Sequence, residues 1–465
     1  MTRWSSGKGT EPVWRITIMT TKPGTPDIEF GNNGARIWDF PEFASIAPHA
    51  IVSLPDGRLV AVANEPGYPR GFVIVRLTEK GQLDAGTGFG EEQLGFARIT
   101  IPEKSVDGIL GSSLLRDGGF LIVLEYSWRP NENGLLVVRL LDAGSLNDKF
   151  GKGGVLVLPD RVVPTLSTGA LRAARRSAGQ DAESVVQGGD NSGVRSIELP
   201  SGKIILATFT YDPSSSQTKG SVIRLNPDGT SDKTFNETGS TWVELGIAGD
   251  NAARGVAAQA DGSLVVFGSY FDAGTAGTYV VRFKEDGVRD EEFPAVMLSS
   301  RYMPRFRDIA VRKKDGMIAI VGGQFEDNFP EGTGVIVVLN EDGSPNLVFN
   351  EGKPLYSKLS PEKGQQWQSC AFGGAEDSKL IVVGTSGSGD IFYDTQAVCA
   401  RYLLTGTLDK SFNTDKGWLA FGQPDRMASA LDAVITSQGK IVICGELYKD
   451  ELSLPVGGWI ARYFS

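Results

Sequence analysis

The chain has 465 residues, of which 40% are hydrophobic and 22% charged, and its formal net charge is −10 with a pI near 5.0. This is the composition of a globular protein, and the negative charge argues against a nucleic-acid partner, which requires a positive surface. No stretch approaches the roughly 18 apolar residues of a membrane span.

The first 23 residues precede any repeated pattern and lack the continuous apolar run of a secretory signal. We therefore expect residues 1–23 to be an irregular N-terminal extension. The protein is then cytoplasmic by default or exported by a non-classical route. Met1 and Met19 both remain candidates for the natural start.

From residue 24 onward one sequence motif recurs seven times: an apolar run, a tight turn and a second apolar run. Copies such as SLPDGRLVAVA and AQADGSLVVFG place Asp-Gly between the two runs. This arrangement predicts a β-hairpin, with strands a and b, joined by a type I′ turn. The turn positions are Gly57, Gly118, Gly202, Gly262, Gly316, Ser378 and Gly439. We expect the unit with Ser378 to be slightly irregular.

A third apolar strand, c, follows each hairpin, as in FVIVRL, LLVVRL and the C-terminal GWIARY. After strand c comes a Gly-x-x-[Asp/Asn]-x-x-Phe turn element, then a fourth strand, d. The turn elements are residues 81–89 (two residues longer), 144–150, 229–235, 287–293, 343–349 and 406–412.

The seventh copy stops at Ser465, directly after its strand c, and its missing turn element lies at residues 24–30. The count closes at seven only if the N-terminal strand completes the C-terminal unit. Radial stacking buries the apolar face of each unit. We therefore predict an all-β, seven-bladed β-propeller over residues 24–465. Each blade has four antiparallel strands, and the N-terminal strand closes the ring.

The pattern D-G-x-[ILV]-x-[VI]-x-G, followed by A-R-Y and G-x-L-D-x-x-F-[GN], resembles the Delta-60 repeat family of bacterial β-propeller repeats. The segments AVCARYLLTGTLDKSFN and VVRLLDAGSLNDKFGKGG carry the resemblance most clearly. It implies a propeller scaffold and no particular activity, because function depends on sites placed on the scaffold.

Strand c carries a recurrent arginine, and the turn element supplies an acid or amide, usually eight positions later. A buried guanidinium must be paired, so we interpret these residues as structural ion pairs rather than as a ring that binds an anion. The arginines are Arg76, Arg139, Arg224, Arg282, Arg401 and Arg462, with Leu339 taken as the exception. The expected partners are Asp84, Asn147, Asp232, Asp290, Asn346, Asp409 and, for the last blade, Asp27.

Few residues suggest chemistry. The single histidine, His49, lies in strand a of the first unit, where a semi-buried structural role is favoured over a catalytic base. No phosphate-binding loop, nucleophile elbow or metal-ligand motif is present. We therefore expect neither a metal nor another cofactor. Cys370, Cys399 and Cys444 lie in apolar stretches and read as core residues.

Two regions vary between units. An insertion at about residues 160–193 separates strand d of the second unit from strand a of the third. An insertion of this length is either functional or disordered. The b–c connections carry aromatic and acidic residues on what should be one face of the propeller, around the channel mouth. We select as ligand contacts, with rim packing as the alternative, Tyr126, Trp128, Tyr270, Phe392, Tyr393, Asp272, Asp327 and Asp394.

The sequence identifies neither a reaction nor a ligand. The leading hypothesis is a monomeric, non-enzymatic binding module that presents a glycan- or protein-binding face on the b–c side. One alternative is a carbohydrate-active hydrolase or lyase that uses loop carboxylates at the channel mouth. Another is a purely structural interaction domain.

Overall fold

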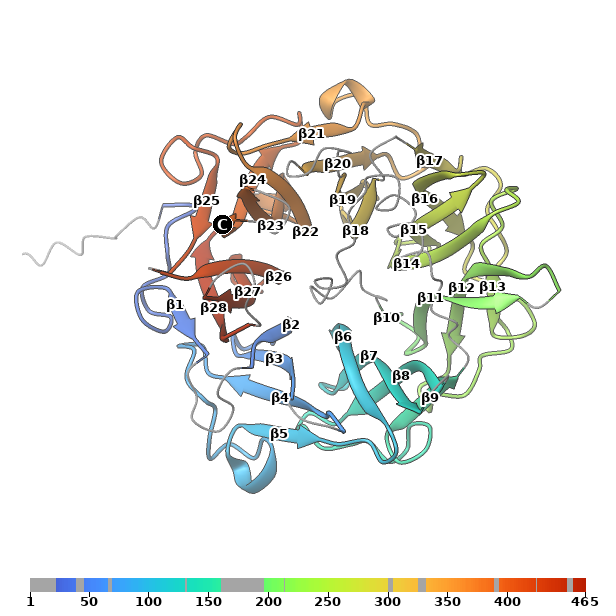
Figure 1. Ribbon diagram of the computed structural model, residues 1–465, viewed down its shortest axis with the longest axis horizontal. Helices are drawn as coiled ribbons and strands as arrows, with labels where there is room; N and C mark the ends of the chain where they lie inside the picture. The colour runs from blue at the N-terminus through green and yellow to red at the C-terminus, as the bar shows by residue number, and fades with distance from the viewer. Residues whose placement is uncertain are drawn as a thin grey trace, which may run out of the picture.

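The computed structural model describes residues 22–38, 46–65, 69–129, 132–159, 196–212, 214–299, 304–324, 332–388, 393–423, 425–449 and 455–465. These residues form seven four-stranded antiparallel sheets arranged as blades around a central axis (Figure 1). The predicted seven-bladed propeller is confirmed. None of the described helical segments is long and apolar enough to cross a membrane.

Within each blade, strand a lies nearest the axis and strand d outermost (Figure 1). Blade 1 comprises β2 (Pro48–Ser53), β3 (Leu59–Asn64), β4 (Phe72–Leu77) and β5 (Phe96–Ile99). Blade 2 comprises β6 (Ser105–Leu114), β7 (Phe120–Arg129), β8 (Glu132–Leu140) and β9 (Val155–Pro159). Blade 3 comprises β10 (Ser196–Glu198), β11 (Ile204–Asp212), β12 (Gln217–Leu225) and β13 (Ser240–Trp242). The insertion at residues 160–193 lies outside the described residues.

Blade 4 comprises β14 (Asp250–Ala258), β15 (Leu264–Asp272), β16 (Thr275–Phe283) and β17 (Val296–Ser299). Blade 5 comprises β18 (Arg305–Val311), β19 (Ile318–Gln324), β20 (Thr333–Leu339) and β21 (Leu355–Ser357). Blade 6 comprises β22 (Gly364–Gly373), β23 (Lys379–Ser388), β24 (Tyr393–Leu403) and β25 (Trp418–Phe421). Blade 7 comprises β26 (Met427–Ile435), β27 (Lys440–Tyr448), β28 (Gly457–Phe464) and, from the N-terminus, β1 (Ala35–Ile37).

The N-terminal strand closes the ring as predicted. Strand β1 pairs antiparallel with β28, with Arg36 opposite Ile460. The turn element at residues 24–30 binds the same strand, because Asp27 donates its backbone N–H to the carbonyl of Arg462. Blade 7 is therefore built from both ends of the chain.

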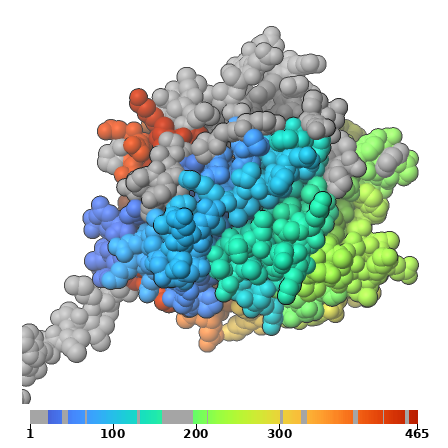
Figure 2. Space-filling view, turned by 90° about the horizontal axis from the view of Figure 1, so that it is seen from below, coloured from blue at the N-terminus to red at the C-terminus, as the bar shows by residue number. Residues whose placement is uncertain are grey.

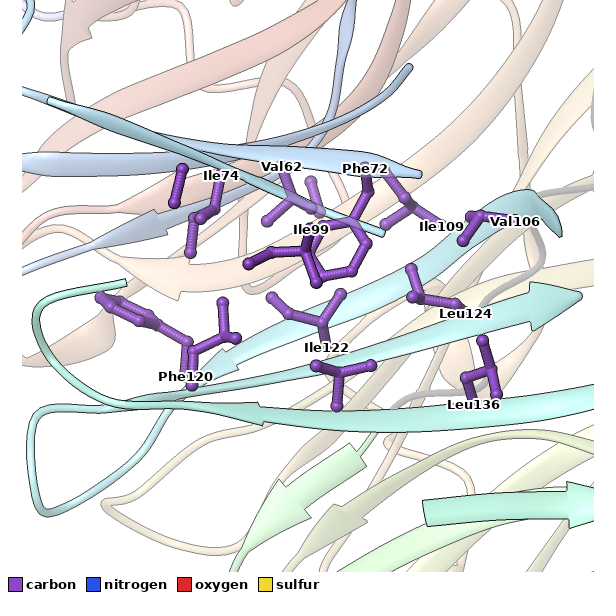
Figure 3. Packing of buried hydrophobic residues seen from close by; sticks show 14 of the residues in the cluster. Val62, Phe72, Ile74, Ile99, Val106, Ile109, Phe120, Ile122, Leu124 and Leu136 are labelled. Carbon is purple, nitrogen blue, oxygen red and sulfur yellow. The ribbon is translucent and has the colours of Figure 1, made fainter. Parts of the chain in front are cut away.

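The core is divided into seven apolar clusters, one at each interface between neighbouring blades. Between blades 1 and 2, for example, Ile74 and Ile99 face Phe120 and Ile122 (Figure 3). The blades stand side by side around the outer wall (Figure 2). The interface between blades 7 and 1 contains Phe30, Ile460 and Val75 and is packed like the others.

The Phe-[Gly/Asn] step of the turn element also joins neighbouring blades. The residue after the phenylalanine has positive φ in six blades and donates its N–H to the turn of the next blade, as Gly151 does to Asp228. Glycine and asparagine tolerate this left-handed conformation. In blade 4 the position is Pro294, whose ring fixes φ and which has no N–H to donate.

The a–b turns differ from the predicted type I′ geometry. In blade 1, Gly57 donates to Leu54 and has a φ of 87°, whereas Asp56 does not have positive φ. Leu54 also donates to Arg58, which makes this a type I turn followed by a glycine bulge. Where Ser378 replaces the glycine, the positive φ moves to Glu376 and Asp377, inside the short helical turn η5 (Ala375–Asp377).

Candidate functional site

Two of the aromatic residues selected as ligand contacts, Tyr126 and Tyr270, are buried. Their exposed fractions are 2% and 8%, and each belongs to an apolar cluster between blades. Each ring also lies over a glycine of strand c, Tyr126 over Gly134 and Tyr270 over Gly277, where a Cβ atom would clash. As packed, neither ring presents a face to a ligand.

Tyr126 and Tyr270 are not in loops, because strand b continues past them. In blade 4, Asp272 is the last residue of β15 and pairs with Thr275, so that the b–c connection is a two-residue turn. Its two residues, Ala273 and Gly274, have φ of 46° and 83°, as a type I′ turn requires. The expectation of adaptable b–c loops is wrong for this blade.

The other selected residues are dispersed. Trp128 is a half-buried residue of β7, and Asp394 is exposed in β24 with a φ of 55°. The backbone of Tyr393 belongs to β24. Phe392 and Asp327 lie outside the described residues.

The arginines of strand c form ion pairs with the aspartates of the turn element at N–O distances of 2.7 to 2.9 Å. The pairs are Arg76–Asp84, Arg224–Asp232, Arg282–Asp290, Arg401–Asp409 and Arg462–Asp27. Each guanidinium also lies 4.5 to 4.9 Å from the ring of the phenylalanine that ends the element. Several of these arginines also donate a hydrogen bond to the next blade. Arg462, for example, donates to the carbonyl of Glu79.

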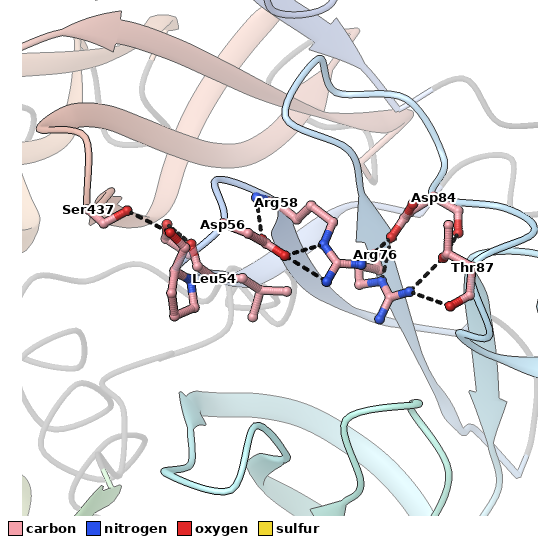
Figure 4. A network of polar contacts seen from close by, with 9 residues as sticks. Leu54, Asp56, Arg58, Arg76, Asp84, Thr87 and Ser437 are labelled. Carbon is pink, nitrogen blue, oxygen red and sulfur yellow. Dashed lines mark hydrogen bonds and ion pairs between the residues drawn. The ribbon is translucent and has the colours of Figure 1, made fainter.

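Sequence reasoning missed a second cation in four of these pairs. The residue directly after the turn glycine or Ser378 is basic in four units, and its side chain reaches the same aspartate. The contacts are Arg58–Asp84, Lys203–Asp232, Lys379–Asp409 and Lys440–Asp27. In blade 1, Arg58 joins Asp56 to Asp84 while Arg76 joins Asp84 and Thr87 (Figure 4).

These cations keep the aspartates ionised. Burial alone would raise the pKa of Asp27, but the hydrogen bond from Lys440 and the charge of Arg462 outweigh it and lower the pKa. Against the same effect of burial, Arg58 and Arg76 lower the pKa of Asp84, and Arg282 lowers that of Asp290. For Asp409 and Asp232 the hydrogen bonds from Ser411 and Thr234 contribute more than the neighbouring cations, and the pKa of Asp232 falls to about 2. These carboxylates hold the scaffold together on the side of the a–b and c–d turns.

Two blades depart from this arrangement. In blade 5 the residue equivalent to the arginine is Val338 rather than Leu339, because the backbone of Asn346 donates to the carbonyl of Val338 as Asp84 donates to Arg76. In blade 2, where the turn element offers Asn147, Arg139 instead pairs with Asp117 of its own a–b turn.

The inner strands share an irregularity that the sequence analysis did not predict. Strand a is interrupted by a β-bulge at the same register in all six blades in which that part of the strand is described. The corresponding stretch of blade 3 precedes β10 and lies outside the described residues. We call the bulged residues the axial residues: His49, Leu110, Arg254, Arg307, Gln368 and Leu431.

The last glycine of the repeat, in strand b, is explained by this bulge. In blade 6 a Cβ atom on Gly384 would lie 1.9 Å from the carbonyl oxygen of Gln366, and in blade 7 one on Gly445 would lie 1.8 Å from that of Ser429. Gly268 and Gly322 are equally restricted. In these four blades only glycine lets the carbonyl of the bulged strand approach so closely, whereas blades 1 and 2 form the bulge opposite Ala63 and Leu124.

The axial residues comprise one histidine, two leucines, two arginines and one glutamine. All except Leu110 are partly exposed, whereas the residues directly before and after each of them are buried in most blades. Strand a is the innermost strand, so this exposure lies next to the ring axis (Figure 1). Bulges commonly redirect a side chain at a functional site.

His49 reaches the preceding blade. Its Nε2 lies 3.4 Å from Oε1 of Glu446, and the hydroxyl of Tyr448 donates to the other oxygen of that carboxylate. Burial lowers the pKa of His49 more than Glu446 raises it, so the ring is neutral at pH 7. The arrangement fits a structural histidine at the seam between blades 7 and 1.

The outer part of blade 3 presents exposed aromatic and charged groups together. The ammonium of Lys219 lies 3.3 Å from Asp212, 3.1 Å from Glu244 and 5.9 Å from the centre of the Trp242 ring. Trp242 is 40% exposed, and Tyr211, on the opposite face of the same blade, is 41% exposed. Among the described residues, no group of three or more His, Cys, Asp or Glu side chains is placed to hold a metal ion.

Comparison with known proteins supports a propeller repeat. The model of a family described as a domain of unknown function (DUF5122) β-propeller matches residues 199–235 and 259–293. Each match runs from an a–b turn to the phenylalanine that ends the turn element. No curated protein matches the chain significantly.

Solved structures with a similar course of the chain are remote in sequence. Sqt1 from Chaetomium thermophilum is 12% identical with a TM-score of 0.43, and the match covers 91% of this chain and 97% of that one. The polysaccharide lyase Uly1 is 9% identical with a TM-score of 0.44, covering 90% of both chains. An ulvan lyase bound to -[GlcA(1-4)Rha3S]- is 10% identical with a TM-score of 0.45, covering 92% and 95%. At these values the similarities carry no argument about function.

Proposed function

We propose that the protein is a non-enzymatic binding module that holds a glycan or protein ligand on the side of the b–c and d–a connections. One observation carries this proposal: the bulges in strand a place four kinds of side chain, histidine, leucine, arginine and glutamine, at one register of the innermost strand in the six blades where it is described, on a scaffold that otherwise repeats. Variation of this kind on a rigid framework is how repeat scaffolds acquire specific sites.

The opposite side of the ring offers less variation. There the a–b turns and the turn elements repeat the same paired aspartate, arginine and phenylalanine from blade to blade. Their polar groups are used within the scaffold. Specificity is therefore better supported on the b–c side, where the Lys219 and Trp242 surface of blade 3 adds an exposed aromatic ring between fixed charges.

The proposal is tested by a glycan array and a protein-capture screen with the full-length chain, followed by affinity measurements. We expect Arg307→Ala or Trp242→Ala to weaken binding of a ligand found in this way. The matched control is Lys314→Ala in the a–b turn of blade 5, whose exposed pair with Glu376 lies on the other side of the ring. A ligand whose affinity falls for Lys314→Ala and not for the other two variants would place the site elsewhere. Turnover of the bound ligand would show an enzyme instead.

A further inference from the structure

The turn element of blade 5 exposes two adjacent apolar side chains. Leu347 is 76% exposed and Val348 is 66% exposed, on the side of the ring that carries the a–b and c–d turns. Among the described large apolar residues, only Ile28 of blade 7, at 68%, is exposed to a comparable degree. Single apolar side chains on a surface are ordinary, whereas adjoining ones with polar surroundings are typical of an interaction surface.

In every other blade at least one of these two positions is polar. The pairs directly before the phenylalanine are Thr87–Gly88, Asp148–Lys149, Lys233–Thr234, Glu291–Glu292, Lys410–Ser411 and Ile28–Glu29. In blades 3 and 6 the second position serves the scaffold, because the arginine of strand c donates to the hydroxyl of Thr234 or Ser411. Blade 5 has Val338 in place of that arginine and needs no such hydroxyl. The missing arginine does not explain why both exposed positions are apolar.

The apolar pair is presented by a turn with a fixed backbone. The side-chain oxygen of Asn346 accepts hydrogen bonds from the N–H groups of Val348 and Phe349. A Cβ atom on Gly352 would lie 2.9 Å from Leu347, which therefore packs over this glycine. Phe349 is buried in the apolar cluster between blades 5 and 6. A partner therefore meets a preformed surface, and little ordering opposes its binding.

The surface around this pair is acidic. The turn element of blade 4 adjoins that of blade 5, since a Cβ atom on Gly343 would lie 2.6 Å from the ring of Phe293. In residues 284–293 and 340–353 together, eight residues are acidic and three are basic. Six of the acidic residues are exposed and form no ion pair within the described part of the chain. They are Glu285, Asp286, Glu291, Glu292, Glu341 and Asp342.

We propose that the turn side of blades 4 and 5 docks a basic amphipathic segment of a partner protein. Its apolar side chains would pack on Leu347 and Val348, and its lysines or arginines would face the surrounding carboxylates. This surface goes beyond the proposed function, because it lies on the side of the ring opposite to the b–c connections. Charge complementarity selects this occupant. A second copy of the chain would bring another acidic surface and a further net charge of −10 against it.

The test uses the full chain and three synthetic peptides of equal length. The probe is a peptide of leucine and lysine patterned as an amphipathic helix. One reference peptide has glutamate in place of every lysine, and the other has serine in place of every leucine. Binding is followed by calorimetry at low and high salt. We expect only the leucine–lysine peptide to bind tightly, with an affinity that falls as salt rises and persists in part, because salt screens the charges but not the apolar contacts.

Substitution of the apolar pair locates the site. The double variant Leu347→Ser and Val348→Ser should weaken binding of the leucine–lysine peptide by about tenfold or more, because it removes the apolar contacts. The matched control is Ile28→Ser, at the equivalent turn position of blade 7, which should bind as the unchanged protein. All three side chains are exposed, so the unliganded variants should melt like the unchanged protein.

Substitution of the acids tests the charge complementarity. Glu291→Gln combined with Glu292→Gln should weaken the peptide severalfold at low salt and have little effect at high salt, because screening already removes this contribution. The matched control is Asp148→Asn, at the equivalent and equally exposed turn position of blade 2, which should leave the affinity unchanged.

The outcomes are distinct. Equal binding of the serine or the glutamate peptide would overturn the inference, and so would affinity that survives the double serine substitution or a complete lack of binding. A dimer in sedimentation that the double serine substitution dissociates would make a second copy the occupant and overturn it too. Trp242→Ala, which tests the proposed function, should leave peptide binding unchanged, so that the two proposals fail separately.

Discussion

The closure of the ring depends on a carboxylate that can be removed without changing the shape of the chain. Asp27 comes from the N-terminal segment, and its Oδ2 lies 2.7 Å from Nε of Arg462 and 2.9 Å from Nζ of Lys440. The side chains of Asp27 and Arg462 are each only 2% exposed. Asp27→Asn preserves the volume and removes the charge that two buried or partly buried cations share.

We expect Asp27→Asn to lower the free energy of unfolding by about 3 kcal/mol, at the lower end of the roughly 3–5 kcal/mol lost when one partner of a buried pair is removed. The lower value is appropriate because Arg462 keeps its hydrogen bond to Glu79 and its position over Phe30. The matched control is Asp56→Asn, whose carboxylate is half exposed beside Arg58. Exposed pairs contribute about 0–1 kcal/mol, so this variant should be nearly neutral.

The measurement is urea unfolding followed by tryptophan fluorescence, with the midpoint compared at constant slope. Asp232→Asn is the second reference, since it breaks the equivalent arrangement inside blade 3, where both partners belong to one continuous segment. Similar losses for Asp27→Asn and Asp232→Asn would mean that the closing seam is as firm as an internal one. A loss for Asp27→Asn no larger than that for Asp56→Asn would refute the reasoning.

Three further predictions concern the paired aspartates, the core and the N-terminal segment. The folded state lowers the pKa of five aspartates: Asp27, Asp84, Asp232, Asp290 and Asp409. The stability that they contribute is therefore complete above about pH 4 and is lost as the pH falls through the lowered pKa values. Melting temperatures measured from pH 7 to pH 2.5 should show this decline, and a flat profile would contradict it. Tyr270→Ala should lower the free energy of unfolding by about 3–5 kcal/mol, as the loss of a buried aromatic side chain does. The exposed Tyr211 is the control, and Tyr211→Ala should lower it by less than about 0.5 kcal/mol. Equal shifts in melting temperature would show that Tyr270 is not a core residue. Deletion of residues 1–40 removes β1 and the turn element of blade 7, so the truncated chain should lose most of its stability, and an unchanged melting curve would rule out closure by this segment.

The architecture was predictable because each of the seven sequence repeats carries the same pattern of strands and turns. Seven hairpins and seven turn elements fix the number of blades, and the displaced element at residues 24–30 fixes how the ring closes. The spacing of eight residues between Arg282 and Asp290 was enough to anticipate their pairing. The basic residue after the turn glycine, such as Lys440, carried a signal as well, because it recurs in four units.

The binding residues were harder to predict because their exposure depends on where strand b ends. Tyr270 and Tyr211 look alike in the sequence, each in an aromatic segment after a hydrophobic strand. Tyr270 lies two residues beyond the last glycine of the repeat and faces the interblade core, whereas Tyr211 lies three residues beyond the equivalent position, Thr208, and is exposed. A one-residue change in register moves a side chain to the other face of the sheet.

The axial residues could not be identified from strand a alone, because a bulge breaks the two-residue alternation by which inward and outward positions are recognised. The information lies in the neighbouring strand instead. A glycine in the middle of an apolar strand b, such as Gly322, is unfavourable for that strand and is retained where the carbonyl of Arg305 comes within 1.9 Å of the place a Cβ would occupy. The repeat glycine therefore reports a bulge in the strand beside it. Blades 4 to 7 all have this glycine, and in blades 4 to 6 the residue that the bulge directs toward the axis is Arg254, Arg307 or Gln368. The repeat glycine of strand b, which looks like a purely structural residue, therefore marks the bulges at which the site is proposed.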